Sequence, residues 1–187
     1  MTSTSTEPSV LVALLEKFAG LTYPTLLGSN EPVYVFDGIT GPNQPDNFIQ
    51  VGGTQDPTIS GGQVFAGLGA TVKYEDYVID CAISCYVGGD DNPGWGSADT
   101  ATSSAAKSDA QLSARSNAYA IFAQIEQALI SDIQLQNVAD PVNPFTVLWC
   151  EVVPKTTTQT IDDDPESSKG RACNIYFDVR AHGRIFP

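Results

Sequence analysis

The stretch from Gly67 to Asp91, GLGATVKYEDYVIDCAISCYVGGDD, constrains the fold of this chain more than any other. From Tyr77 to Val87 the strongly apolar side chains fall on odd positions, and a more mixed set falls on even positions. This period-two alternation, rich in Val, Ile and Tyr, predicts a strand with one apolar face. Eleven residues at ~3.3 Å each span ~36 Å, which is long for a globular strand. We therefore expect a central strand whose odd-numbered face is covered by helices.

Two segments repeat apolar residues at three- and four-residue steps, which predicts amphipathic helices. The first runs from Ser9 to Ala19 and the second, much longer, from about Lys107 to Asp132. Short strands are expected over Val33–Gly38 and Asn47–Gly53, whereas the segment through Gly61-Gly62 is expected to be a loop.

The last third of the chain predicts a β-hairpin. Phe145–Lys155 is rich in β-formers, and apolar and polar residues alternate cleanly from Cys173 to Ala181. Between them lies a polar tip, Ile161–Gly170, which we expect to be flexible, as we expect of the N-terminal lead, residues 1–8. The 187 residues are thus expected to form one α+β domain with a mostly antiparallel or mixed sheet. The long helix and the short N-terminal helix would pack on one face of that sheet.

The charge is strongly one-sided, with 22 acidic and 9 basic residues and a net charge of −13. Such a surface repels nucleic acid and anionic membranes, so specific DNA or RNA binding is not expected. The only apolar run near the N-terminus, Val10 to Leu15, is too short to be a membrane span and lacks the basic lead of a signal peptide. We expect a soluble protein made in a reducing compartment.

The four cysteines are expected to pack in the core as free thiols. Cys81 and Cys85 share one strand face about 13 Å apart, too far to bridge each other. Cys173 falls on the apolar face of its strand, and the side on which Cys150 lies is not evident. No C-x-x-C pair is present, so no zinc site is expected.

No catalytic constellation emerges from the remaining residues. His182, the one histidine, falls on the polar phase of a strand, where a solvated or hydrogen-bonded role is expected. The run Asp90–Gly94 lacks the glycine register and the distal Glu of a calcium loop. No pair of carboxylates is flanked by an apolar pocket that would shift its pKa. We expect no cofactor, no metal and no enzymatic activity.

The order of these landmarks resembles the tail terminator proteins of long-tailed, siphovirus-type bacteriophages, in particular those that infect actinobacteria. The resemblance rests on the N-terminal helix followed by VYVFDG and NFIQVGG, and on the segment from Phe65 to Asp91. It continues with the helix ending AIFAQIEQALISD and the hairpin ending GRACNIYFDVRAHGRI. Its details are the glycine-rich Phe65–Gly69, an acidic residue, Glu75, before the long strand, the Gly89-Asp90 turn and Gly170 before the last strand.

The resemblance implies a structural virion protein, made in the host cytoplasm, that acts without catalysis. Six copies would form a homohexameric ring that caps the head-proximal end of the tail tube, ends its polymerisation and offers a surface for head joining. Its partners would be the tail tube protein and the head–tail connector proteins, while DNA passes through the lumen without specific binding. The alternatives are a head–tail connector or adaptor of the neck, or, in a different class, a small-ligand binding module or cryptic enzyme with a concave pocket.

Two segments are candidate contacts between subunits or with a connector. One is the polar tip, which is longer than a tight hairpin needs; the other is the Gly/Ser/Ala-rich crossover from Gly88 to Ser108, in which Trp95 is the one large apolar side chain. The alternative readings are a surface loop without a partner for the tip and a buried anchor for Trp95. The candidate contact residues are Asp162, Asp163, Asp164, Glu166, Lys169 and Trp95.

Overall fold

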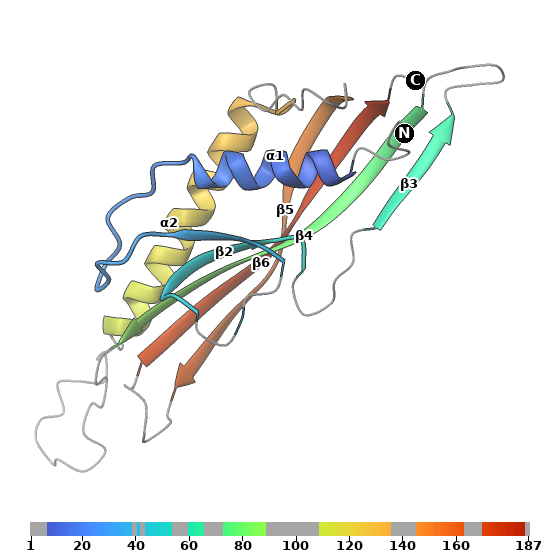
Figure 1. Cartoon of the computed structure of the whole chain (residues 1–187). Coiled ribbons are helices and arrows are strands. Elements are labelled where there is room, and N and C mark those ends of the chain that lie inside the picture. Colours follow the sequence, from blue (N-terminus) through green and yellow to red (C-terminus); the bar gives the residue numbers. More distant parts are fainter. Residues whose placement is uncertain are drawn as a thin grey trace, which may run out of the picture.

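The long central strand is confirmed. The computed structural model describes residues 7–38, 41, 44–53, 60–65, 73–88, 109–135, 145–162 and 170–185. Strand β4 covers Lys73–Gly88, 16 residues, and lies inside the sheet (Figure 1). Its odd-numbered side chains from Tyr77 to Val87 are all buried. The alternation seen in the sequence therefore corresponds to one face of this strand lying against the core.

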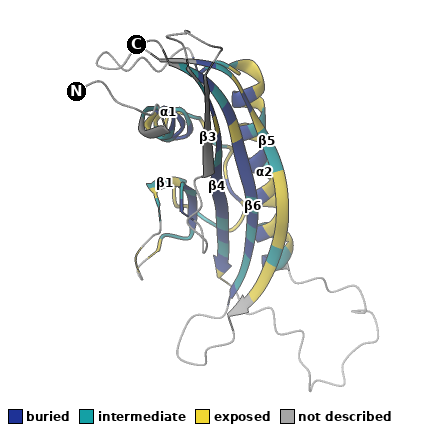
Figure 2. Cartoon of the chain, turned by 90° about the vertical axis from the view of Figure 1, so that its right-hand side faces the viewer, coloured by how far each residue is buried: buried dark blue, intermediate teal, exposed yellow. Residues whose placement is uncertain are grey.

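The sheet is mixed, with the strand order β1-β2-β4-β6-β5, and the α+β fold class is confirmed. Strand β1 (Tyr34–Asp37) runs parallel to β2 (Asn47–Val51), and every other pairing is antiparallel. Strand β6 (Gly170–Ile185) pairs with β4 over its full length, and β5 (Phe145–Asp162) completes the hairpin with β6. Strands β1 and β5 therefore form the two opposite ends of this order (Figure 2).

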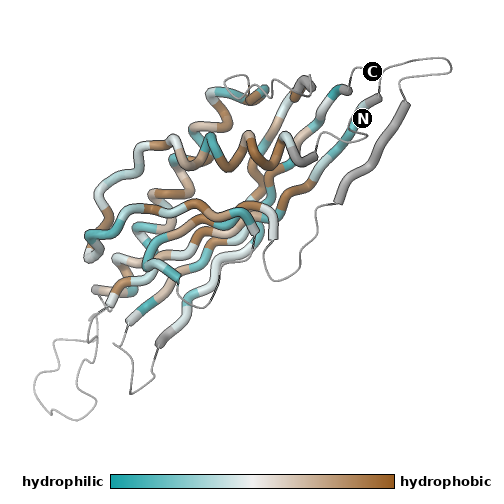
Figure 3. Tube along the Cα trace, viewed as in Figure 1, coloured by the Kyte–Doolittle hydropathy of each residue, from teal (hydrophilic) through white to brown (hydrophobic). Residues whose placement is uncertain are grey.

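Both helices contribute to a single buried cluster on one side of the sheet. Helix α1 (Glu7–Ala19) packs on β1 and β2, and helix α2 (Asp109–Ser131) packs on β4, β6 and β5. Apolar residues run along α1 and along the strands below it (Figure 3). The ion pair between Lys17 Nζ and Asp132 Oδ2, 2.7 Å, joins the end of α1 to the turn after α2. The helix-on-one-face arrangement expected from the sequence is thus present.

The connection from α1 to β1 is fixed against the N-terminal half of α2. The side-chain amide of Asn117 donates to the Leu27 carbonyl oxygen at 2.9 Å, and its oxygen accepts from the Leu27 N–H at 2.8 Å. Gly28 follows with φ +69°, a left-handed conformation that glycine adopts without steric cost. A Cβ at this position would lie 2.8 Å from Cγ1 of Val87, so the close approach also requires glycine.

Three expectations from the sequence are corrected. The segment through Gly61-Gly62 is strand β3 (Ser60–Phe65), not a loop, because β4 extends far enough toward its N-terminus to pair with it. For the same reason Glu75 lies inside β4 and is 1% exposed, so it does not precede the long strand. Strand β5 continues seven residues beyond the predicted end at Lys155, because the ladder with β6 persists to Asp162.

None of the helices in the described ranges is apolar over a length that would cross a membrane. Most of the N-terminal lead, residues 1–6, and most of the crossover before α2 lie outside the described residues.

Candidate assembly surfaces

The two segments singled out from the sequence leave the sheet at the same end. Gly88, the last residue of β4, pairs with Gly170, the first residue of β6, which in turn pairs with Asp162, the last residue of β5. The crossover that contains Trp95 starts after Gly88, and the polar tip spans the seven residues between Asp162 and Gly170. The sheet therefore brings the attachment points of both segments together, although Gly88 and Asp162 are 74 positions apart in the sequence.

The candidate contact side chains themselves are not described. Trp95, Asp163, Asp164, Glu166 and Lys169 lie outside the described residues, and Asp162 is described as the terminal ladder residue only. Ile161, Asp162 and Gly170, which the sequence assigned to the tip, belong to the β5–β6 ladder.

A second surface is the face of the sheet opposite the helices, here called the open face. It carries the even-numbered side chains of β4 and β6, because these two strands pair in register without interruption. In the described part of the chain, no helix packs against this face.

Three rings from three strands stack on the open face. The ring of His182 on β6 lies between Tyr74 on β4, 5.4 Å between centroids, and Trp149 on β5, 5.9 Å. The interplanar angles are 12° and 16°, so the rings are nearly parallel. Nδ1 of His182 lies 2.6 Å from Oδ1 of Asp76, which is 65% exposed. The expected hydrogen-bonded histidine is thus found, in an aromatic stack that the sequence did not predict.

A pair of buried carboxylates on the same face was missed from the sequence. Asp80 and Asp178 are register partners on β4 and β6 and are 7% and 6% exposed. Lys155 Nζ lies 2.5 Å from Oδ1 of Asp80 and 2.6 Å from Oδ1 of Asp178. A register shift between Pro154 and Thr156 accompanies this position of Lys155 on the edge strand.

This pair corrects the expectation that no carboxylates share an environment that shifts a pKa. Burial raises the pKa of Asp178, and the neighbouring Asp80 raises it further, while Lys155 acts in the opposite direction. The hydrogen bonds to Asp178 and Asp80 raise the pKa of Lys155. The three groups link β4, β6 and β5 across the open face. The signal in the sequence was the even position of both aspartates, which becomes informative only once the strand register is known.

The thiols lie on the covered side of the sheet, and all four are free and buried. Cys85 and Cys173 are register partners across β4 and β6, and Cys150, whose side was not evident from the sequence, is also part of the core. Burial raises the pKa of Cys85 to about 12 and that of Cys150 to about 11. Within the described ranges no three His, Cys, Asp or Glu side chains are grouped as a metal site would require.

The connection between α1 and β1 borders a hollow of about 470 Å³. Leu21, Tyr23 and Leu26 contribute apolar surface, while Ser29 and Glu31 contribute polar atoms. The hydroxyl of Tyr23 is already engaged, because it donates to the Phe18 carbonyl oxygen at 2.7 Å. The arrangement is a loop-lined depression between elements.

The chain matches no family model, and no curated protein matches it.

Proposed function

We propose that the chain is the subunit of a homohexameric ring that caps the head-proximal end of a bacteriophage tail tube. In this role it is a tail terminator: it ends polymerisation of the tube and presents a surface for head joining. The tail tube protein would bind one side of the ring and the head–tail connector proteins the other. The subunit would be made in the host cytoplasm and reside in the virion.

The observation that carries the proposal is the meeting of Gly88, Gly170 and Asp162 at one end of the sheet. The two segments that the sequence marks as contact candidates are both joined to the sheet there. If every subunit of a ring presents that end in the same direction, their tips form one rim, which is what a cap needs to face a connector or a tube.

The charge distribution supports passage of DNA without capture. Strands β4, β5 and β6 together carry six acidic and five basic side chains, so most of the net charge of −13 resides elsewhere in the chain. The acids of these strands are Glu75, Asp76, Asp80, Glu151, Asp162 and Asp178, and the bases are Lys73, Lys155, Arg171, Arg180 and Arg184. A nearly balanced sheet next to acidic connections offers no continuous basic track for phosphates.

Imaging of virions tests the proposal directly. Density at the upper end of the tail should contain six copies of this chain arranged as a closed ring. Finding the chain in the capsid shell would contradict the proposal. A copy that contacts the connector and never the tube would favour the neck adaptor instead, and cross-linking to the tube protein separates these two roles.

A further inference from the structure

Strand β5 forms one end of the sheet, and within the described residues no segment pairs with its outer side. Such an edge presents a row of backbone N–H and C=O groups, which natural proteins usually interrupt with proline, charged residues or irregular pairing. In β5 these interruptions are Pro154, Lys155 and the register shifts that end at Trp149 and Thr156. From Thr156 to Ile161 the strand contains no proline and no charged residue, and its ladder with β6 is regular.

The direction in which each backbone group of β5 points follows from the register. The Tyr86 N–H donates to the Asp46 carbonyl oxygen at 2.8 Å, so the even-numbered residues of β4 turn their backbone groups toward β2. Because these groups alternate along a strand, the odd-numbered residues of β4 bond to β6, and the even-numbered residues of β6 bond to β5. The even-numbered threonines of β5 pair with the latter, so the N–H and C=O groups of Thr157, Gln159 and Ile161 point outward.

The position of Pro154 agrees with this assignment. The register shift before Thr156 changes the parity, so Pro154 also occupies an outward position, where its missing N–H removes no ladder bond. The outward row is therefore interrupted at Pro154 and continues without a further interruption from Thr157. Both Thr157 and Gln159 are exposed.

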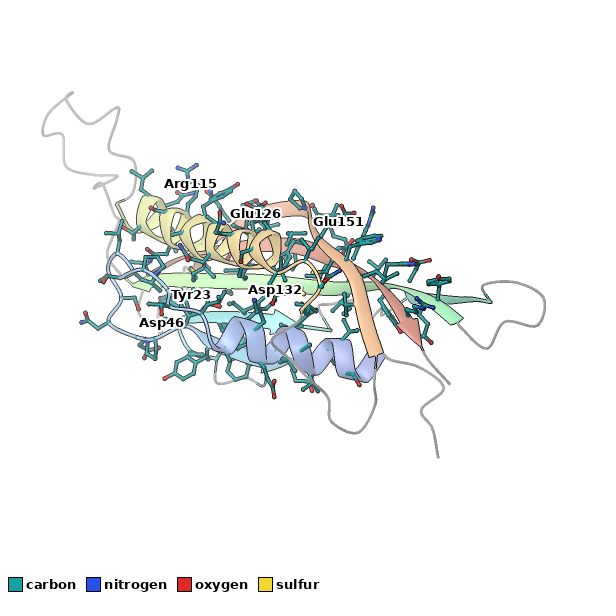
Figure 4. All side chains as sticks on the ribbon, turned by 90° about the horizontal axis from the view of Figure 1, so that it is seen from above. Tyr23, Asp46, Arg115, Glu126, Asp132 and Glu151 are labelled. Carbon is teal, nitrogen blue, oxygen red and sulfur yellow. The ribbon has the colours of Figure 1, made fainter. Side chains whose placement is uncertain are left out.

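Helix α2 lies alongside this part of the edge and brings a basic side chain to it. Gln111 Nε2 donates to Oε1 of Gln159, and the hydroxyl of Tyr119 is 3.2 Å from Oγ1 of Thr157. Arg115 is four residues from each of these two helix positions, so all three lie on one flank of α2. Arg115, which is labelled in Figure 4, is exposed.

The charge of Arg115 acts at the level of Gln159. Burial raises the pKa of Cys173, the register partner of Gln159, and the positive charge of Arg115 opposes that rise. The two acids of α2, Asp109 and Glu126, are not three or four residues from Arg115, the spacing at which helical side chains pair. None of the ion pairs formed by the described residues includes Arg115. An exposed guanidinium beside this strand edge favours an incoming carboxylate.

We infer that the outward row from Thr157 to Ile161, together with Arg115, binds an extended segment of a partner protein that carries a carboxylate. We call these residues the β5 edge site. The backbone row determines the class of occupant, because a polypeptide in the β conformation offers matching donors and acceptors at the same spacing. The guanidinium determines its charge, since a carboxylate accepts bidentate hydrogen bonds from arginine. The inference goes beyond the proposed ring and does not depend on it.

The test titrates the full chain, labelled with nitrogen-15, with three synthetic peptides whose ends are blocked. The first has the sequence TVEVTVT, the second replaces its glutamate by lysine, and the third is the first with a methyl group on every backbone nitrogen. The first peptide should shift the amide resonances of Thr157 and Gln159 to saturation and slow their hydrogen exchange. The lysine peptide should bind at least about fivefold more weakly, and the methylated peptide, which cannot donate from its backbone, should not bind.

Two variants separate the contribution of the backbone from that of the charge. Thr157→Pro removes an outward N–H without removing a ladder bond and should weaken binding of the first peptide at least about tenfold. Thr157→Val, which loses only the contact with Tyr119, is its control and should bind as the wild type does. Arg115→Glu should reverse the preference, so that the lysine peptide binds better than the glutamate peptide, whereas Gln127→Glu, elsewhere on α2, should not. Circular dichroism and thermal melting verify that each variant is folded.

The assignment fails if no peptide binds at millimolar concentration, if the methylated peptide binds equally well, or if Arg115→Glu keeps the preference of the wild type. That last measurement decides the matter even if Thr157→Pro does not fold. Slow exchange of Thr157 and Gln159 in the free monomer would mean that the chain covers this edge itself. Protection that increases with protein concentration would mean that a second copy does, and either result would overturn the assignment.

Discussion

At the scale of single residues, the ion cluster of Lys155, Asp80 and Asp178 is the most consequential polar feature. Two nearly buried carboxylates share one ammonium group, and that group comes from the edge strand of the sheet. Removing one partner of such a cluster leaves buried charge without compensation, which costs more than the intact cluster contributes.

We therefore expect Lys155→Met to lower the free energy of unfolding by about 1–2 kcal/mol at neutral pH, an amount reduced because the Lys155 side chain is nearly half exposed. Urea unfolding of the variant and of wild type measures the difference. Lys155→Arg keeps a cation at the position and is the matched control. Equal stability of Lys155→Met and wild type at neutral pH would contradict this account.

The destabilisation caused by Lys155→Met should also depend on pH, and its direction follows from the pKa of Asp178. Burial raises the pKa of Asp178 above its ordinary value of 3.8, so the folded state holds this proton more tightly than the unfolded state does. The stability linked to this proton is full below 3.8 and is lost as the pH rises through the higher, folded-state pKa. Without Lys155 that pKa rises further. The destabilisation by Lys155→Met should thus be largest at neutral pH and shrink in acid; a constant difference across this range would refute it.

The thiols provide a second prediction at this scale. Each of the four cysteines is at most 4% exposed, and burial raises the pKa of every one of them, so little thiolate forms near neutral pH. A thiol reagent should count four groups in denaturant without reductant and react with the native protein only as it unfolds. A count of two would mean a disulfide, for which the register partners Cys85 and Cys173 are the first candidates. Stoichiometric zinc in elemental analysis would contradict core packing.

At the scale of elements, the β5–β6 hairpin allows the strand-paired residues and the tip to be tested separately. Its described ladder runs to the pair formed by Asp162 and Gly170, which are separated by seven residues in the sequence. A tight hairpin needs only about two to five loop residues, fewer than are present here. We therefore keep the contact role of the tip as a prediction to be tested.

Replacing Asp162–Lys169 with a two-residue turn should leave the melting temperature of the free subunit nearly unchanged while reducing completed tails or head joining. The matched control replaces the acids of the tip by Asn and Gln at constant length, which separates the effect of charge from that of reach. Calorimetry of the subunit and counts of joined particles are the measurements. Wild-type titres of joined particles from the shortened variant would refute a contact role for the tip.

At the scale of the whole molecule, the balance of charge excludes a basic nucleic-acid surface on the described strands. Arg180 and Arg184 occupy even positions of β6 and share the open face, whereas Arg171 occupies an odd position on the other side. Arg180 also lies 4.0 Å from Glu151, and Glu151 is exposed beside it. Three arginines close in sequence therefore do not form one patch.

We accordingly expect no measurable binding of duplex DNA at physiological salt, because few phosphate contacts are available to release counterions. A gel-shift titration over a range of salt concentrations checks this. Arg180→Glu should leave the result unchanged. Micromolar, salt-sensitive binding that is lost in this variant would show that the open face binds phosphates after all.

The sequence by itself determined the helices, the long central strand, the hairpin and the burial of Cys81, Cys85 and Cys173. These follow from local periodicity, because the spacing of apolar residues within a strand or helix shows which of its faces is buried. The predicted tip began two residues too early, because Ile161 and Asp162 belong to the β5–β6 ladder. Strand β3 was not, because Gly61-Gly62 resembles a turn and becomes a strand only by pairing with β4.

Only the tertiary structure decided which side chains meet. Asp80 and Asp178 are 98 positions apart, and Lys155 joins them across a register shift that no spacing in the sequence reveals. The aromatic stack around His182 likewise draws its rings from three strands. The same holds for the shared attachment end of the crossover and the tip, where Gly88, Gly170 and Asp162 pair. Such juxtapositions depend on strand order and register, which are set by packing between distant segments and not by the pattern within any one of them.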